Sequence, residues 1–110
     1  MDPNKVYQEL RAAGMDWADK QATYRQLDDQ SKSILAQITL EAKALPDVSS
    51  MAEAKDIALA ASLYRDHLRA VAEALREALR AKVDYEARNS LFQARRTQEA
   101  TERAALGAAP

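Results

Sequence analysis

The sequence predicts an all-α protein: an antiparallel helical hairpin, or coiled coil, of two long helices plus a short N-terminal helix, assembled into a dimeric bundle. The 110 residues include only 2 Gly and 3 Pro, so few positions favour a turn. Apolar residues recur at the period of a helix face rather than alternating as in a strand. Hydrophobic residues make up 47% of the chain but aromatic ones only 5%, because Ala is frequent. This composition favours a thin bundle over a globule with a deep interior.

The first predicted helix covers residues 3–13. Asp2 is suited to cap the free N–H groups of the first turn, and Pro3 fits the first helical position. Gly14 is expected to end this helix, because glycine commonly takes the left-handed conformation that follows a last turn.

The second predicted helix covers residues 16–45 and carries a heptad repeat. One heptad position holds Trp17, Tyr24, Ser31, Ile38 and Leu45. Pro46 is expected to end the helix, because proline cannot continue it and disfavours helical angles at the residue before it.

The third predicted helix covers residues 50–105. Ser50 and Glu53 match the capping-box pattern that opens a helix. Residues at seven-residue spacing then form an apolar stripe: Ile57, Tyr64, Val71, Ala78, Tyr85 and Phe92. The stripe ends at Phe92, and a tail follows after about residue 96. The tail beyond it is either a frayed extension or an assembly segment, and fraying is favoured because a helix without packing is marginal.

A chain reversal at Pro46–Ser50 would bring together residues whose numbers sum to roughly 96, as in an antiparallel coiled coil. Leu27 would then lie near Leu68, and Trp17 near Ala78. The first helix would cover apolar residues that the second helix is too short to reach. We therefore expect residues 1–110 to form a single helical domain.

Catalytic, cofactor-binding and metal-binding sites are not expected. His67 is the only histidine, and its neighbours one turn away, Leu63 and Val71, are neither metal ligands nor partners for a catalytic base. The chain has no cysteine, no Gly-rich phosphate loop and no Gly-x-Ser-x-Gly elbow. These features predict a protein that is not an enzyme and needs no cofactor.

A candidate partner or nucleic-acid surface lies between Arg76 and Arg96, although the net charge of the chain is only −1. Its basic residues are Arg76, Arg80, Lys82, Arg88, Arg95 and Arg96. They outnumber the acidic residues of this segment, which are Glu77, Asp84 and Glu86. Such a surplus would give weak, salt-sensitive contact with phosphates.

A candidate oligomer interface consists of apolar residues off the heptad stripe. These residues are Leu63, Leu79, Val83 and Leu91. A lone hairpin would leave Leu63, Leu79 and Val83 partly exposed, which favours a homo-oligomer, most simply a dimer. No segment approaches the ~18 apolar residues that a membrane span needs, and no apolar leader follows Met1. We therefore expect a cytoplasmic protein that does not associate with membranes.

Three segments of the third helix carry a resemblance to known proteins: Tyr64-Arg65-Asp66-His67-Leu68, Ala81-Lys82-Val83-Asp84-Tyr85-Glu86-Ala87-Arg88 and Phe92-Gln93-Ala94-Arg95-Arg96-Thr97. They resemble small uncharacterised helical proteins encoded by tailed bacteriophages and prophages. The resemblance covers the last half of the chain and implies no catalytic residues. It implies an accessory factor for DNA replication or recombination, or an inhibitor of a host system.

The sequence therefore predicts a non-enzymatic interaction protein that acts through protein–protein contacts. Two alternatives stay open: a DNA-metabolism accessory that contacts DNA through the Arg76–Arg96 surface, and an inhibitor of a host enzyme. A host or phage protein is the expected partner besides a second copy of the chain.

Overall fold

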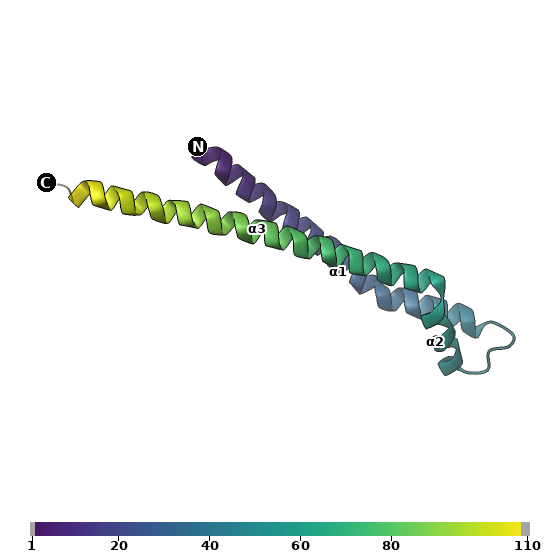
Figure 1. Ribbon diagram of the computed structural model, residues 1–110. Helices are drawn as coiled ribbons and strands as arrows, with labels where there is room; N and C mark the ends of the chain where they lie inside the picture. The colour runs from purple at the N-terminus through teal and green to yellow at the C-terminus, as the bar shows by residue number, and fades with distance from the viewer. Residues whose placement is uncertain (1, 109–110) are drawn as a thin grey trace. The chain divides into compact units, whose positions relative to one another are not determined.

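The computed structural model describes residues 2–108, and every regular element in that range is an α-helix. Figure 1 shows the three helices: α1 (Pro3–Lys43), α2 (Met51–Ala60) and α3 (Ser62–Ala108). The all-α prediction is thus confirmed for the described residues.

The described residues fall into two units. Unit 1 contains residues 2–19 of the N-terminal part and residues 79–108 of the C-terminal part, and unit 2 contains residues 20–78. Each unit includes a part of α1 and a part of α3, and each has its own packing.

The predicted helix end at Gly14 is wrong, because α1 continues through it without interruption. Neither glycine has a positive φ, so Gly14 does not take the left-handed conformation of a helix cap. A Cβ placed on Gly14 would lie 3.2 Å from Cε2 of Tyr85. The missing side chain at this position therefore lets the Tyr85 ring approach the backbone of α1.

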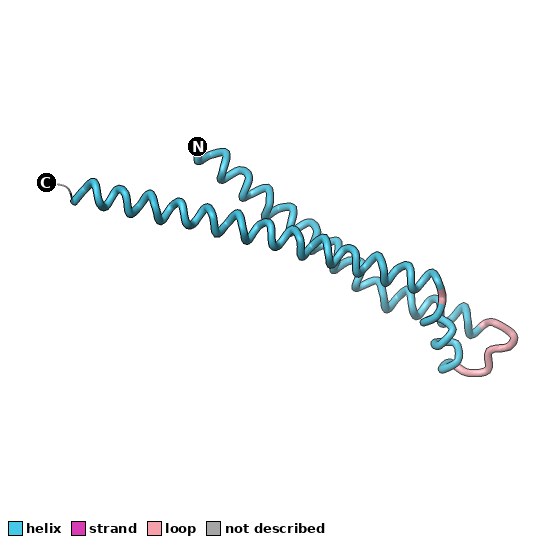
Figure 2. The backbone as a smooth tube through the Cα atoms, in the orientation of Figure 1, coloured by secondary structure: helices cyan, strands magenta, loops and turns pink. Residues whose placement is uncertain are grey.

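The break predicted around Pro46 lies between α1 and α2, and it is the longer loop in Figure 2. The helix ends at Lys43, two residues before the predicted end, where Leu45 N–H bonds to Ala42 O at 3.1 Å. Ser50 then caps α2, since its side chain accepts a hydrogen bond from Glu53 N–H. The Glu53 carboxylate accepts one from the Ser49 N–H rather than from Ser50.

The predicted helix over residues 50–105 is interrupted at Ala61, which we did not predict. Ala61 has φ −63° and ψ 137°, an extended conformation that any residue adopts without strain. The Ala61 N–H bonds to Ala58 O at 3.1 Å, and its carbonyl accepts from Arg65 N–H as α3 begins. The short helix of this fold is therefore α2, not an N-terminal helix.

Unit 2 has a small core at the loop between α1 and α2. Ala42, Val48 and Ala54 form a cluster of buried side chains, and Ala54 is 0% exposed. Within this unit α2 leaves the direction of α3 at Ala61 (Figure 1), which accompanies the burial of Ala54 against Ala42 and Val48. Ile57, predicted to lie on the apolar stripe, is instead 39% exposed.

Unit 1 is held by aromatic and small side chains. The Trp17 and Tyr85 rings pack with their centroids 5.4 Å apart. Ala13 and Ala81 are buried, and Phe92 is half-buried. Past Phe92, α3 remains helical to Ala108, and fraying of residues after 96 stays a prediction.

Candidate interaction surface

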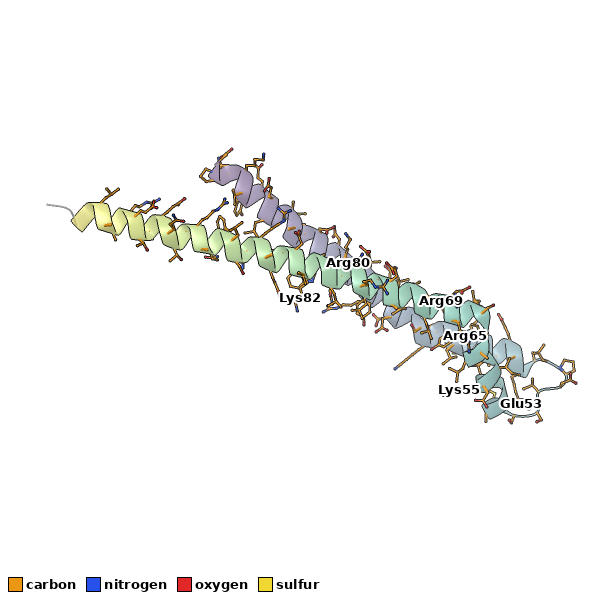
Figure 3. All side chains as sticks on the ribbon, viewed as in Figure 1. Glu53, Lys55, Arg65, Arg69, Arg80 and Lys82 are labelled. Carbon is orange, nitrogen blue, oxygen red and sulfur yellow. The ribbon has the colours of Figure 1, made fainter. Side chains whose placement is uncertain are left out.

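The predicted basic residues do not form one surface. Three of them face carboxylates: Arg76 pairs with Glu73 at 2.6 Å, and Lys82 lies 4.0 Å from Glu86. Arg80 and Lys82, labelled in Figure 3, are two residues apart and therefore differ by about 200° around the helix.

Arg88 is the third paired residue, and it links the two helices of unit 1. Its Nε lies 3.1 Å from both carboxylate oxygens of Asp84, and its Nη1 lies 3.7 Å from Glu9 on α1. A guanidinium held between two carboxylates is already neutralised, which reduces its attraction for phosphate.

Arg95 and Arg96 lie beside the apolar residues of unit 1. The Arg96 guanidinium is 5.9 Å from the centroid of the Phe92 ring, a cation–π distance. Arg95 is half-buried and also has an interaction partner. These two residues border an apolar depression rather than an open basic stripe.

Two cavities of about 280 Å³ each lie between α1 and α3 in unit 1. Both are lined by Val6 from α1 and by Phe92 and Arg95 from α3. The first also has Leu10 and Leu91 in its wall. Side chains at this end of the unit leave apolar space open between the two helices.

The four residues of the predicted oligomer interface are all exposed. Their exposed fractions are 65% for Leu63, 52% for Leu79, 66% for Val83 and 56% for Leu91. Leu79 and Val83 are one turn apart and share a face of α3. Leu91 is eight residues beyond Val83, which turns it about 80° away from that residue. The predicted interface is therefore not a single face.

Other exposed apolar residues escaped the sequence prediction. Leu68 and Leu75, which follow the stripe residues Tyr64 and Val71 by four positions each, are 42% and 37% exposed. Leu106, in the polar tail, is 77% exposed. The sequence could have indicated the exposure of Leu68 and Leu75. They follow Tyr64 and Val71 by four residues rather than seven, so they occupy a different heptad position from the stripe.

His67 contributes to a polar contact in unit 2. Its Nε2 lies 2.9 Å from the Leu27 carbonyl and 3.0 Å from Ser31 Oγ. A carbonyl only accepts, so Nε2 carries the proton and donates to Leu27 O. Ser31 Oγ also donates to Leu27 O at 3.4 Å. This network satisfies the polar residues where α1 meets α3.

Within residues 2–108 no three His, Cys, Asp or Glu side chains are grouped so as to hold a metal ion. Over the same range no helix combines the length and hydropathy that crossing a membrane requires. Comparison of the chain with protein-family models, curated proteins and solved structures gives no match.

Proposed function

We propose that this chain is a non-enzymatic interaction protein that binds other helices, first of all those of a second copy of itself. The support comes from its surface. The chain exposes 8307 Å², whereas a compact monomer of 12.2 kDa exposes roughly 6,000 Å². The difference, about 2,000 Å², exceeds the ~800 Å² that each partner commonly buries in a stable interface.

The pairing of α1 with α3 within each unit supports an antiparallel hairpin. In unit 2, Leu27 and Ser31 contact His67, and in unit 1, Glu9 and Trp17 contact α3. The numbers of the paired residues add up to values between 94 and 102. A nearly constant sum is what helices of opposite direction give, and it lies close to the predicted value.

Self-association would cover apolar side chains that the hairpin leaves in water. In unit 1 these include Leu79 and Val83, and in unit 2 they include Leu68 and Leu75. Each of these pairs lies on one face of α3 by its spacing. Full burial of a fully exposed side chain of this kind is worth about 1.5–3 kcal/mol, so covering these half-exposed side chains contributes favourably to self-association.

Replacement of Leu79 and Val83 by glutamine tests this proposal. We expect Leu79→Gln with Val83→Gln to weaken self-association, measured by light scattering after gel filtration, without loss of helix content. A matched control carries Tyr7→Gln and Met15→Gln, which replace two exposed apolar side chains of α1 in the same unit. Equal association of both double variants and the wild type would contradict a role for this face.

The nucleic-acid alternative has less support in the structure, because Arg76, Lys82 and Arg88 lie beside carboxylates. The resemblance to phage-encoded proteins motivates both a role in cytoplasmic DNA metabolism and inhibition of a host enzyme. Retardation of DNA at low salt that is lost in Arg88→Glu would favour the first of these over simple self-association.

A further inference from the structure

The C-terminal part of α3 carries a self-complementary face. Six of its residues fall within an arc of about 100° around the helix, given 100° per residue. In chain order they are Leu91, Arg95, Gln98, Glu99, Glu102 and Leu106. Each end of the set is a leucine. Next to the leucines lie a basic residue on one side, Arg95, and an acidic residue on the other, Glu102. Gln98 and Glu99 lie in the middle. We call this set the tail face.

We propose that the tail face pairs in antiparallel fashion with the tail face of a second copy of the chain. In such a pair the residue numbers of facing side chains sum to 197. Leu91 then faces Leu106 of the other copy, Arg95 faces Glu102, and Gln98 faces Glu99. A two-fold axis repeats every contact, as in most homodimers.

Charge decides the direction of the pair. In a parallel arrangement in register, Arg95 would face Arg95, and Glu102 would face Glu102, so every charged contact would be repulsive. The antiparallel arrangement turns both into Arg–Glu contacts. Charged residues that flank an apolar contact commonly set orientation and partner in paired helices in this way.

In the proposed pair, the leucines at the two ends of the tail face would meet at a cavity. Leu106 is 77% exposed and Leu91 is 56% exposed. Leu91 lines the cavity of about 280 Å³ whose wall also includes Val6, Leu10 and Phe92. The antiparallel register brings Leu106 of the second copy to this opening, where its side chain would be removed from water.

The described part of α1 begins beside the middle of the tail face. Pro3, the first residue of α1, lines the same cavity as Glu99, so α3 continues past the start of its partner helix. In the described part of unit 1, the residues after Glu99 have no segment of α1 beside them to pack against (Figure 1). In the proposed pair a second copy of the tail packs beside these residues, and the tail is then an assembly segment rather than a frayed end.

This inference rests on the proposed function, since it too makes a second copy the partner, but it uses a different surface. Two charge reversals test it. Arg95→Glu places a second carboxylate opposite Glu102, and Glu102→Arg places a second guanidinium opposite Arg95. Each variant alone should therefore associate about tenfold more weakly than wild type. Mixed in equal amounts, the two variants regain attractive contacts at both positions, and association should return.

Control variants show whether a charge reversal weakens association only when it lies on the tail face. Lys32→Glu and Asp29→Arg make the same kinds of charge change at exposed positions of α1, outside the tail face and outside the Leu79 and Val83 interface, and we expect neither to alter association by itself or in a mixture. Each variant is labelled with a donor or an acceptor dye, and energy transfer reports mixed pairs. Trp17 is the only tryptophan, so its fluorescence confirms that unit 1 stays folded in every variant.

The outcomes are distinct. Loss of association in each reversal and recovery in the mixture supports the tail pairing. Association of Arg95→Glu or Glu102→Arg at wild-type strength, or a mixture that does not recover, overturns it and leaves the Leu79 and Val83 interface to stand alone. Disruption by these reversals but not by Leu79→Gln with Val83→Gln supports the tail and refutes the other face. A wild-type chain that never associates refutes both.

Discussion

At the scale of the residue, the contact between Gly14 and Tyr85 shows how one missing side chain positions two helices. Glycine inside a helix costs about 1 kcal/mol relative to alanine. Here it admits the Tyr85 ring, which also packs on Trp17. Two aromatic rings packed at this distance contribute about 0.5–1.5 kcal/mol beyond their burial. The helix therefore continues through Gly14 because the contact offsets the weak helix propensity.

Alanine at position 14 tests this balance. We expect Gly14→Ala to be nearly neutral in the wild type, because the gain in helix propensity is offset when the new Cβ displaces the Tyr85 ring. In a Tyr85→Ala background the same substitution should stabilise the chain by about 1 kcal/mol more. Urea unfolding followed by circular dichroism can be applied to every variant. It gives the effect of Gly14→Ala on the free energy of unfolding in each background.

Gly107 provides the control for this cycle, because nothing lies within 4 Å of a Cβ built there. Gly107→Ala should have the same small effect whether Tyr85 is present or not. If Gly14→Ala also gave the same effect in both backgrounds, the contact with Tyr85 would not explain the glycine.

At the scale of the element, α2 depends on its cap and on a small core. The helix has only 10 residues, too few to be stable in isolation. Ser50 accepts the hydrogen bond from Glu53 N–H at 3.1 Å, and Ala54 and Ala58 are 0% exposed. Local capping and contact with neighbouring residues thus hold the helix together.

Loss of the cap should weaken α2. We expect Ser50→Ala to lower the free energy of unfolding by about 1 kcal/mol, because it leaves the Glu53 N–H without its acceptor. Ser33→Ala, at an exposed position inside α1, is the matched control and should be neutral or slightly stabilising. Thermal unfolding followed by circular dichroism measures both. An equal effect of the two substitutions would show that the cap contributes nothing.

Some helix ends of this fold could be predicted from the sequence, and others could not. The break at Pro46 and the cap at Ser50 were predictable, because proline and the capping box act through local chemistry. The continuity at Gly14 and the break at Ala61 were not. The first involves Tyr85, which is distant in sequence, and the second accompanies the burial of Ala54 against Ala42 and Val48. Nothing local in the alanine-rich stretch around Ala61 marks a helix end.

The candidate surfaces were only partly predictable for a related reason. Exposure of Leu63, Leu79 and Val83 follows from their positions off the heptad stripe, and the structure confirms it. The pairing of Arg88 with Glu9 joins residues far apart in the chain, so composition alone overstated the basic surface. Helical spacing gives the arc of the tail face, but the cavity beside Leu91 needed coordinates.

At the scale of the whole molecule, the chain buries little. No large side chain in the described residues is less than 2% exposed, and the buried hydrophobic positions are mostly alanines. Small buried side chains contribute little hydrophobic free energy, at about 25 cal/mol per Å². A chain of this kind gains stability when a second copy covers its exposed leucines, so its unfolding temperature should rise with protein concentration.

Sedimentation equilibrium of the wild-type chain over a wide range of concentrations tests this central claim most directly. We predict a mass that rises with concentration from that of one chain, 12.2 kDa, to at least that of two. A mass of 12.2 kDa at every concentration would contradict it.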